Sequence, residues 1–359
     1  MTAPTGHVGR RSRALALVAG QADALLVSDR TNVYYLSGFS GSAGSLLLTA
    51  AGAVLVTDGR YGEQAGRECP GVEVVLDRSP DGGALRRAVA DGAHRVAVEA
   101  DCLTWAAHTA LSGAVGADRL VATRGLVEQV RRSKDDDEVE LLATACRMTE
   151  EALGGVLEWI RPGHTERQIA VRLERAMVDL GADAPAFDSI VAAGVNSALP
   201  HHRPGAAALR AGDLLKIDCG ARFRGYHADL TRMFVIGAEP DSRQSEVHAA
   251  VAAAAAAARA LVAPGVAVTV VDAAARRELG EWEPRFTHGL GHGVGLQIHE
   301  APLLAARSAD TMVRADVLTV EPGVYEPGFG GVRIEDTLLV TDAGARCLTT
   351  MTRDLIRLA

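Results

Sequence analysis

The 359-residue sequence predicts an α/β N-terminal domain at residues 1–130 followed by an α+β domain at residues 131–359. In the first third, short apolar runs alternate with a helix-like segment, whereas longer helical and strand-like segments are grouped in the remainder. The polar stretch Arg131–Asp137 separates the two patterns. A chain of this length is long for one domain and fits two.

Apolar runs of strand length divide the first domain. They lie at residues 24–27, 45–49, 53–57 and 95–98, and turn-forming residues separate them. A helix is expected at 84–90. Because strands and a helix alternate here, we expect a mixed or parallel sheet.

Three helices are expected in the second domain. The first begins at Ser133, whose acidic successors satisfy free N–H groups and oppose the helix dipole, and it ends near residue 160. The second runs from Thr165 to about Leu180. The third is the Ala-rich run 247–262, where small side chains allow close packing on a sheet.

Four strands of the second domain each carry an acidic residue. They are expected at 213–218, 229–236, 317–321 and 332–340, in an antiparallel sheet covered by the helices. The acids considered as ligands are Asp218, Asp229, Glu321 and Glu335.

Asp218 and Asp229 lie near opposite ends of an expected hairpin with Gly220 and Gly225 at its turn. Such a hairpin brings the two carboxylates to one point. A carboxylate at the end of an apolar strand costs free energy unless it is paired or bound to a metal. Taken alone, the pair fits a structural role as well as a site.

A glycine-rich stretch at 287–295 surrounds His292, and His299 follows seven residues later. Alternating glycines allow the backbone to approach a ligand closely. Carboxylates with one imidazole suit two divalent cations, which together polarise a carbonyl and activate water. The predicted metal ligands are therefore Asp218, Asp229, His292, Glu321 and Glu335. Oxygen-rich ligands favour Mn²⁺, with Co²⁺ or Zn²⁺ as alternatives.

These residues resemble, in order and spacing, the proline-peptidase branch of the pita-bread metallopeptidases, which contains Xaa-Pro aminopeptidase and Xaa-Pro dipeptidase. Gaps of 11, 29 and 14 residues separate the two aspartates, His292 from Glu321, and Glu321 from Glu335. Residues 32–42, 57–61 and 196–202 are similar to other segments of that family. The resemblance implies a creatinase-like N-terminal domain and a pita-bread catalytic domain.

The resemblance also implies a role for each ligand. Asp218 is expected to hold one ion, Asp229 and Glu335 to bridge both ions, and His292 and Glu321 to complete the two sites. Glu321 is the expected proton acceptor from the attacking water and the donor to the leaving nitrogen.

Four further residues take roles from the resemblance. His201 and His299 are expected to hold the substrate and stabilise the oxyanion. Arg333, two residues before Glu335, is expected to orient the carboxylates. Thr231 is placed to donate a hydrogen bond to a ligand.

Neighbouring residues have plainer interpretations. His288 fits a structural role at least as well as one near the metals, and His202 and His227 are weaker candidates for the site. Lys216 is expected to be solvated or ion-paired, and Cys219 to pack in the core.

The sequence departs from its family at two positions. Many relatives carry an arginine that helps hold a dipeptide's free carboxylate where this chain has Leu303; Arg307 is a nearby substitute at a different spacing. Ala315 stands where relatives usually have glycine, which predicts a slightly altered turn. We therefore expect removal of the N-terminal residue from longer peptides with proline at the second position.

Other functions remain open. The main alternative is an Xaa-Pro dipeptidase (prolidase). A methionine aminopeptidase is disfavoured because it usually lacks the N-terminal domain and has a longer gap between its two glutamates. Creatinase-like hydrolases and metal-free peptide-binding relatives have lost ligands that this chain retains.

Composition excludes other classes of partner. The net charge of −8 argues against nucleic acid, which binds a concentrated basic surface. The longest apolar stretches fall short of the ~18–20 residues that span a bilayer, so no membrane partner is expected. Five scattered cysteines indicate free thiols in the cytoplasm. The resemblance implies a homodimer or a dimer-based oligomer.

Overall fold

The computed structural model describes residues 5–359, which form two compact units. The first ends at Arg131 and the second is Arg132–Ala359, so the division lies one residue from the expected boundary. Among the described residues, no helix has both the length and the apolar character that crossing a bilayer requires.

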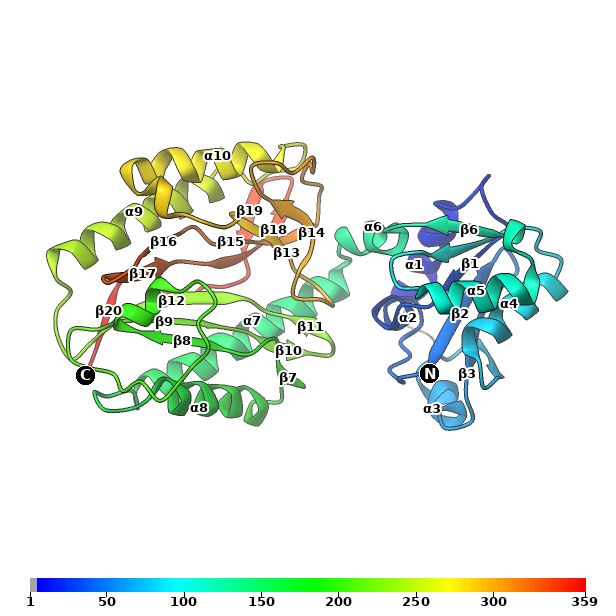
Figure 1. Ribbon diagram of the computed structural model, residues 1–359, viewed down its shortest axis with the longest axis horizontal. Coiled ribbons are helices and arrows are strands. Elements are labelled where there is room, and N and C mark those ends of the chain that lie inside the picture. The colour runs from blue at the N-terminus through cyan, green and yellow to red at the C-terminus, as the bar shows by residue number, and fades with distance from the viewer. Residues whose placement is uncertain (1–4) are drawn as a thin grey trace. The chain divides into compact units, whose positions relative to one another are not determined.

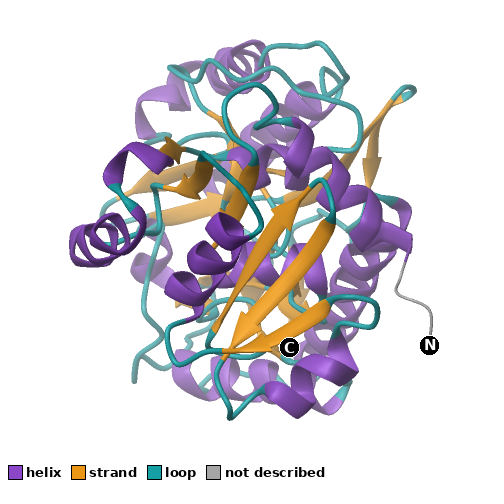
Figure 2. Cartoon of the chain, turned by 90° about the vertical axis from the view of Figure 1, so that its right-hand side faces the viewer, coloured by secondary structure: helices purple, strands orange, loops and turns teal. Residues whose placement is uncertain are grey.

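The first unit contains a six-stranded mixed sheet of order β4-β3-β2-β1-β5-β6. Figures 1 and 2 show strands of this unit with helices beside them. Its strands are β1 (Ala24–Val27), β2 (Gly44–Thr49), β3 (Gly52–Thr57), β4 (Glu73–Leu76), β5 (Val96–Glu99) and β6 (Leu120–Thr123). Its helices are α1 (Thr5–Ala16), α2 (Arg30–Ser37), α3 (Gly62–Glu68), α4 (Pro80–Ala90), α5 (Trp105–Val115), the 3₁₀-helix η1 (Ala117–Arg119) and α6 (Leu126–Arg132). β1 pairs with β2 antiparallel and with β5 parallel, which confirms the expected mixed sheet.

The core of the first unit explains why its strands are apolar along their whole length. Leu26 of β1, Leu47 of β2 and Val98 of β5 are almost completely buried in one cluster with Leu85 of α4. Strands covered by helices read as continuous apolar runs rather than as alternating ones. The four expected strands and the helix at 84–90 are all present, the last as part of α4.

Four long helices cover the second unit (Figure 1). They are α7 (Asp136–Leu157), α8 (Glu166–Asp179), α9 (Ser242–Arg259) and α10 (Val268–Leu279), with the short 3₁₀-helices η2 (Gly194–Ala198) and η3 (Gly280–Arg285). Capping boxes at Asp135, Thr165 and Asp241 start the first three. The expected start at Ser133 is therefore wrong, since that hydroxyl donates to the Arg314 carbonyl instead. α9 also starts before residue 247, and α10 was not expected.

The strands of the second unit form several sheets instead of the single antiparallel sheet expected. A four-stranded sheet has the order β20-β12-β9-β8, and a five-stranded sheet has the order β14-β13-β15-β18-β19. Small sheets of order β11-β10-β7 and β16-β17 complete the unit. The strands are β7 (Ala184–Pro185), β8 (Ile190–Ala193), β9 (Leu214–Cys219), β10 (Ala221–Phe223), β11 (Tyr226–His227), β12 (Leu230–Ile236), β13 (Gly291–Gly293), β14 (Glu300–Leu304), β15 (Val317–Val320), β16 (Gly323–Glu326), β17 (Gly330–Arg333), β18 (Asp336–Thr341), β19 (Gly344–Cys347) and β20 (Ile356–Leu358).

Two hydrophobic cores hold the helices on the outside of these strands. α7 and α8 share one core with β8, β9 and β12, in which Leu173 and Ile217 are fully buried. α9 and α10 share the other with β15 and β18, around Val251 and Leu318. In Figure 1 the strands of the second unit lie between these two helix pairs. The two larger sheets meet at an isolated bridge between Thr231 and Glu335.

The hairpin around Asp218 and Asp229 is more complex than expected. β9 pairs with β12 so that Asp218 lies opposite Thr231, and Asp229 directly precedes β12. Between them, β10 and β11 form a separate hairpin that turns at Gly225, where φ is +82°. Gly220 is not in this turn. Its place requires glycine because an added Cβ would collide with the Ala228 carbonyl.

The strand expected at 332–340 is two strands. β17 ends at Arg333 and pairs with β16, whereas β18 begins at Asp336 and pairs with β15 and β19. Glu335 lies in the break, and its N–H donates to the Thr231 carbonyl over 3.2 Å. The interruption places Glu335 where the two larger sheets meet.

Ala315 precedes the strand that ends before Glu321. It has a φ of +64°, the left-handed region that costs a non-glycine residue about 1–2 kcal/mol. The alanine thus adopts the conformation in which glycine is favoured. Its carbonyl accepts a hydrogen bond from Lys134 N–H over 3.0 Å, and its own N–H donates to Val340 over 2.9 Å.

Candidate metal centre

The five predicted ligands line one cavity of about 460 Å³. Each comes from a strand end or from the residue beside one: Asp218 from β9, Asp229 just before β12, His292 from β13, Glu321 just after β15, and Glu335 between β17 and β18. His201, His299 and Arg333 line the same cavity. The fold therefore gathers all eight residues predicted for the site.

His292 presents a neutral imidazole to the carboxylates. Its Nδ1–H donates to the Gly293 carbonyl over 3.0 Å, which leaves the Nε2 lone pair facing the cavity. Burial lowers the pKa of His292 to about 4. Its Nε2 lies 3.6 Å from both Asp229 Oδ2 and Glu321 Oε1, too far for a hydrogen bond. Ligands that hold one ion at about 2.1 Å lie roughly 3–3.5 Å apart, so this spacing suits a shared cation.

The four carboxylates carry more negative charge than the protein neutralises. Within residues 5–359, Arg333 is the one arginine or lysine that forms ion pairs with them, to Asp218 and, over 3.9 Å, to Glu321. Burial and the neighbouring Glu335 raise the pKa of Asp229 well above its usual range, and burial raises that of Glu321 to about 8. Divalent cations would replace the protons that these groups otherwise retain.

Asp218 supplies the clearest test of whether the residues fit a metal. Arg333 donates to its Oδ2, but its buried Oδ1 has no hydrogen-bond partner among the described residues. A buried acceptor without a partner costs roughly 1–3 kcal/mol, which a cation would offset. Donor atoms of Asp229, His292 and Glu335 also lie within 4.8 Å of one another. The residues present therefore fit divalent metal ions.

The five predicted ligands are called here the metal cage. Hydrogen bonds from residues behind the cage fix the orientation of its carboxylates. Thr231 Oγ1 donates to Glu335 Oε2 over 2.6 Å and accepts from Arg333 Nε over 3.1 Å. Arg333 Nη1 also donates to the Tyr325 hydroxyl over 2.9 Å, and His288 Nε2 lies 2.8 Å from that hydroxyl. The expected hydrogen bond from Thr231 is confirmed, and His288 is linked to the carboxylates through Tyr325 and Arg333.

Three supporting residues were not predicted. Tyr325 holds Arg333, as described above, and Thr319 Oγ1 accepts the His292 N–H over 3.1 Å. Arg232 is 2% exposed and donates to the backbone carbonyls of Thr231 and Glu335, where the two sheets meet. Thr319 lies two residues before Glu321, and this spacing on a strand indicates that both side chains point the same way. No comparable signal marks Tyr325 or Arg232.

His201 and His299 differ in their support within the cavity, which His202 also lines. The His299 ring lies edge-on to His292, with ring centroids 4.4 Å apart. Burial lowers the pKa of His201, whose side chain lines the cavity from the segment after η2. Imidazole nitrogens beside the carboxylates can form hydrogen bonds with a substrate.

The weaker candidates have varied positions. The expectation that Lys216 is solvated or ion-paired is wrong: its side chain is fully buried and its Nζ donates to backbone carbonyls. Cys219 packs in the α7–α8 core as expected. His227 lies against the Gly295 carbonyl and does not line the cavity of the predicted ligands. His202 lines that cavity, and its Nε2 lies 2.8 Å from Glu166 Oε2.

A second hollow of about 290 Å³ adjoins the cage. His201, His292, His299, Glu321 and Arg333 line both cavities. Leu303 lines the second hollow and is 54% exposed, whereas Arg307 lines neither cavity. The structure thus gives no support to Arg307 as a substitute for the missing arginine.

We predict that the metal-free protein loses stability as the pH rises from 6.5 to 8. Glu321 has a folded pKa of about 8 and a reference pKa of 4.5, so the folded chain retains a proton that the unfolded chain releases. The resulting stabilisation is complete below pH 4.5 and is lost as the pH rises through 8, about 1–2 kcal/mol over this window. The lowered pKa of His292 acts mainly below pH 6.5.

Thermal unfolding of chelator-treated protein at pH 6.5 and 8 tests this prediction. Its midpoint should fall at the higher pH, whereas protein loaded with Mn²⁺ should keep or raise its midpoint because metal binding favours deprotonated ligands. A midpoint of the metal-free protein that rises across this window would contradict the raised carboxylate pKa values.

Comparison with known families places this site in context. Residues 10–133 match the Creatinase/Prolidase N-terminal domain, and residues 140–342 match metallopeptidase family M24. The uncharacterized peptidase YqhT of Bacillus subtilis is 35% identical over 341 residues, which cover 93% of this chain and 95% of that protein.

Solved structures of Xaa-Pro peptidases are also similar to this chain. The Xaa-Pro dipeptidase from Bacillus anthracis has a TM-score of 0.94 and 34% identity, covering 98% of this chain and 100% of that one. The X-Pro aminopeptidase from Thermotoga maritima MSB8 has a TM-score of 0.90 and 34% identity, with coverage of 96% and 100%. Both dipeptidases and aminopeptidases are thus similar to this chain.

These matches confirm the creatinase-type N-terminal domain, the pita-bread catalytic domain and the resemblance to proline peptidases. Family M24 uses two metal ions, and the buried Asp, His and Glu donors provide a possible site for them. The chain belongs to metallopeptidase family M24, in its group of Xaa-Pro dipeptidases and aminopeptidases.

Proposed function

We propose that this enzyme removes the N-terminal residue from peptides of three or more residues that have proline at the second position. The preference for longer peptides rests on Leu303, an uncharged residue that lines the hollow beside the cage. A charge-assisted hydrogen bond to a free carboxylate is worth about 1.5–3 kcal/mol, and leucine cannot form one. A dipeptide would therefore lose affinity that a longer peptide does not need.

The protein's own side chains would perform the proton transfers and hold the substrate. Glu321 would accept a proton from the attacking water and return it to the nitrogen that leaves. His201 and His299 would hold the substrate and donate to the oxygen that becomes negative. Arg333 would keep Asp218 oriented. Two divalent ions, which we propose to be Mn²⁺, would polarise the scissile carbonyl and favour ionisation of water.

The main cavity also has an apolar wall suited to a proline ring. Phe187, Ile190, Ile298 and Pro204 line it beside the polar residues. Apolar walls with a few placed polar groups are typical of small-ligand sites. We propose that these side chains contact the apolar parts of the substrate.

A peptide panel tests the proposed length preference. With Mn²⁺ present, Xaa-Pro-Xaa tripeptides should be cleaved with a higher kcat/KM than Xaa-Pro dipeptides, and peptides without proline should be poor substrates. Dipeptides cleaved far faster than tripeptides would identify a prolidase instead. Preference for N-terminal methionine without proline would indicate a methionine aminopeptidase, and saturable binding without hydrolysis would indicate a peptide-binding protein.

Leu303→Arg should shift the enzyme towards dipeptides. An arginine at this rim would supply the absent cationic partner, so kcat/KM for Xaa-Pro dipeptides should rise about 10- to 100-fold, as expected for about 1.5–3 kcal/mol. Tripeptide hydrolysis should change much less. Leu303→Met is the matched control, because it replaces the side chain without adding charge. An equal change for both substrate lengths would show that Leu303 does not set length preference.

We also propose a cellular compartment, an oligomeric state and the absence of two classes of partner. The five cysteines are free thiols, which supports a reducing cytoplasm. We propose a homodimer, and we propose that neither nucleic acid nor membrane is a partner, in keeping with the net charge of −8.

A further inference from the structure

His201 lines the cavity without side-chain support of its own. Within residues 5–359, no residue forms a hydrogen bond with its imidazole, in contrast to His292 and His288. Its position beside the cage therefore depends on the backbone of residues 193–205, called here the His201 segment. The fully buried side chains of Lys216 and Glu166 hold that segment from different elements.

Lys216, on β9, holds the middle of the His201 segment. Its Nζ donates to the carbonyls of Ser197 over 3.1 Å and Leu199 over 2.7 Å, and lies 3.4 Å from that of Pro200. The Pro200 carbonyl also accepts from Arg333 over 3.1 Å. Lys216 is 0% exposed, and no carboxylate of the described chain forms an ion pair with it. Its donors are thus directed to the peptide just before His201.

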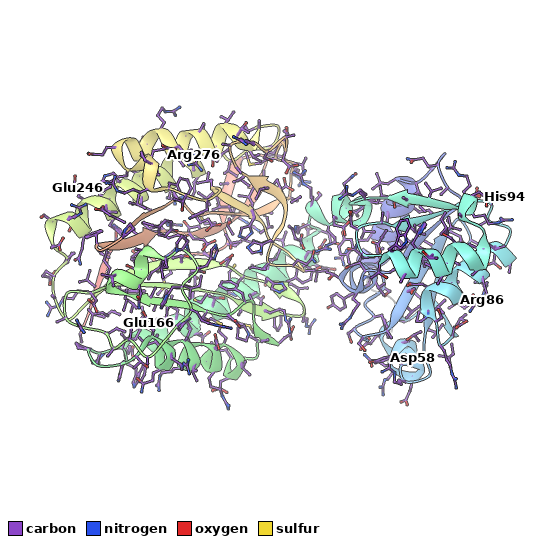
Figure 3. The ribbon with its side chains drawn as sticks, in the orientation of Figure 1. Asp58, Arg86, His94, Glu166, Glu246 and Arg276 are labelled. Atoms are coloured by element: carbon purple, nitrogen blue, oxygen red, sulfur yellow. The ribbon has the colours of Figure 1, made fainter. Side chains whose placement is uncertain are left out.

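Glu166, on the first turn of α8 and labelled in Figure 3, holds both ends of the His201 segment. Its Oε1 accepts from the Ala193 N–H and from Asn196 Nδ2, each over 2.9 Å. Its Oε2 accepts from the Gly205 N–H over 3.1 Å and pairs with His202 Nε2 over 2.8 Å. Four contacts from one carboxylate therefore close this loop around His201.

Capping of α8 does not account for the buried carboxylate of Glu166. Thr165 and Gln168 already form the capping box of that helix, and the hydrogen bonds described for the Glu166 carboxylate all lead to the His201 segment. Glu166 is 0% exposed, and burying a charge costs several kcal/mol before its partners offset it. Replacing such groups by apolar residues is often neutral or stabilising, so stability alone gives little reason for them.

We propose that Glu166 and Lys216 are positioning residues that fix the His201 segment so that His201 faces the metal cage. The two residues act on peptide hydrolysis through His201 and touch neither substrate nor metal. This inference rests on the proposed function, because it assigns His201 a part in hydrolysis.

Glu166→Gln is the sharpest substitution, because it preserves size and removes one acceptor. An amide has one oxygen, so its NH₂ group must face either the Ala193 and Asn196 donors or the Gly205 and His202 donors. The segment should shift, and a displacement of about 1 Å can cost about 10²-fold in rate. We expect kcat/KM to fall 10- to 100-fold with metal content unchanged.

A double-mutant cycle separates positioning from general damage. In a His201→Ala background, Glu166→Gln should reduce kcat/KM less than threefold, because the group that it positions is already absent. Asp241→Ala, which removes the N-cap of α9 far along the chain, is the stability control and should lower the melting temperature without this dependence. Equal losses from Glu166→Gln in both backgrounds would overturn the proposal.

Amide hydrogen exchange keeps this inference separate from the proposed function. In Glu166→Gln, amide hydrogen exchange should accelerate at Ala193 and Gly205 but not in α9, whether or not a peptide is cleaved; unchanged exchange would refute the proposal.

His202→Gln, which retains a donor near the Nε2 position, should keep most of the activity that His202→Ala loses. If the wild-type enzyme cleaves no Xaa-Pro peptide, the proposed function fails while the exchange result still decides the positioning role. Lys216→Met should likewise accelerate exchange in the segment, with metal content measured alongside.

Discussion

Asp229→Asn should abolish most peptide hydrolysis and weaken metal binding at least about 100-fold. Asp229 Oδ2 lies 3.6 Å from His292 Nε2, in the group of donors that also includes Glu335. An amide retains the size of the side chain but loses the charge and one of the oxygens that bridging requires. Changes to groups behind metal ligands already cost 10–100-fold in affinity or activity, so loss of a ligand should cost more. Titration with Mn²⁺ and steady-state kinetics measure the two effects.

Asp241→Asn is the matched control for this substitution. It makes the same chemical change at the N-cap of α9, where asparagine is as good a cap as aspartate. Its metal content and kcat/KM should stay within twofold of the wild type. If Asp229→Asn retained both metal ions and wild-type activity, Asp229 would not be a bridging ligand.

Glu321→Gln should lower kcat about 10²- to 10⁴-fold while leaving much of the metal bound. The amide oxygen can still coordinate a cation, but the side chain no longer accepts a proton from water. Burial raises the pKa of Glu321 to about 8, so its neighbourhood already favours the protonated form that such an acceptor must adopt. Kinetics at saturating Mn²⁺ should therefore show a large fall in kcat with a small change in KM.

The control for Glu321→Gln is Glu140→Gln, at an exposed position on α7 that pairs with Arg147. It should leave kcat unchanged, since surface ion pairs contribute little. A Glu321→Gln enzyme whose kcat remains within tenfold of the wild type, with full metal content, would assign the proton transfer to another group.

The sequence predicted the elements whose pattern is local. Continuous apolar runs such as 24–27 and 53–57 indicated buried strands correctly, since burial on both faces leaves no polar alternation. The expected helix start at Ser133 lies two residues before the N-cap in the structure. Asp135 is the N-cap because Glu138, three residues later, completes a capping box with it.

Division of the expected antiparallel sheet could not be read from the sequence. The run 332–340 is apolar enough for one strand, yet Glu335 interrupts it where Thr231 of the other sheet approaches. That break depends on contacts between residues more than a hundred positions apart, which periodicity does not report. The same break explains how Glu335 reaches the cage.

The cage residues were predictable because each is an acid or histidine at a strand end. Thr231 and Arg333 were also predicted, whereas the two residues that hold the His201 segment were not. From the sequence alone, Lys216 resembles a solvated strand residue, although in the structure it is buried beneath the His201 segment. Glu166 resembles an ordinary acid in the first turn of a helix. The contacts of Lys216 and two of the four contacts of Glu166 are to backbone atoms of a loop, which no residue type in the sequence marks.

The central claim is that Asp218, Asp229, His292, Glu321 and Glu335 together hold two divalent cations. Metal analysis of the full chain after dialysis against Mn²⁺ tests it most directly, with Asp229→Asn measured beside the wild type. We predict about two ions per wild-type chain and fewer in the variant, with hydrolysis of Xaa-Pro-Xaa peptides following metal content. Fewer than one ion per wild-type chain, together with no peptide hydrolysis, would contradict the claim.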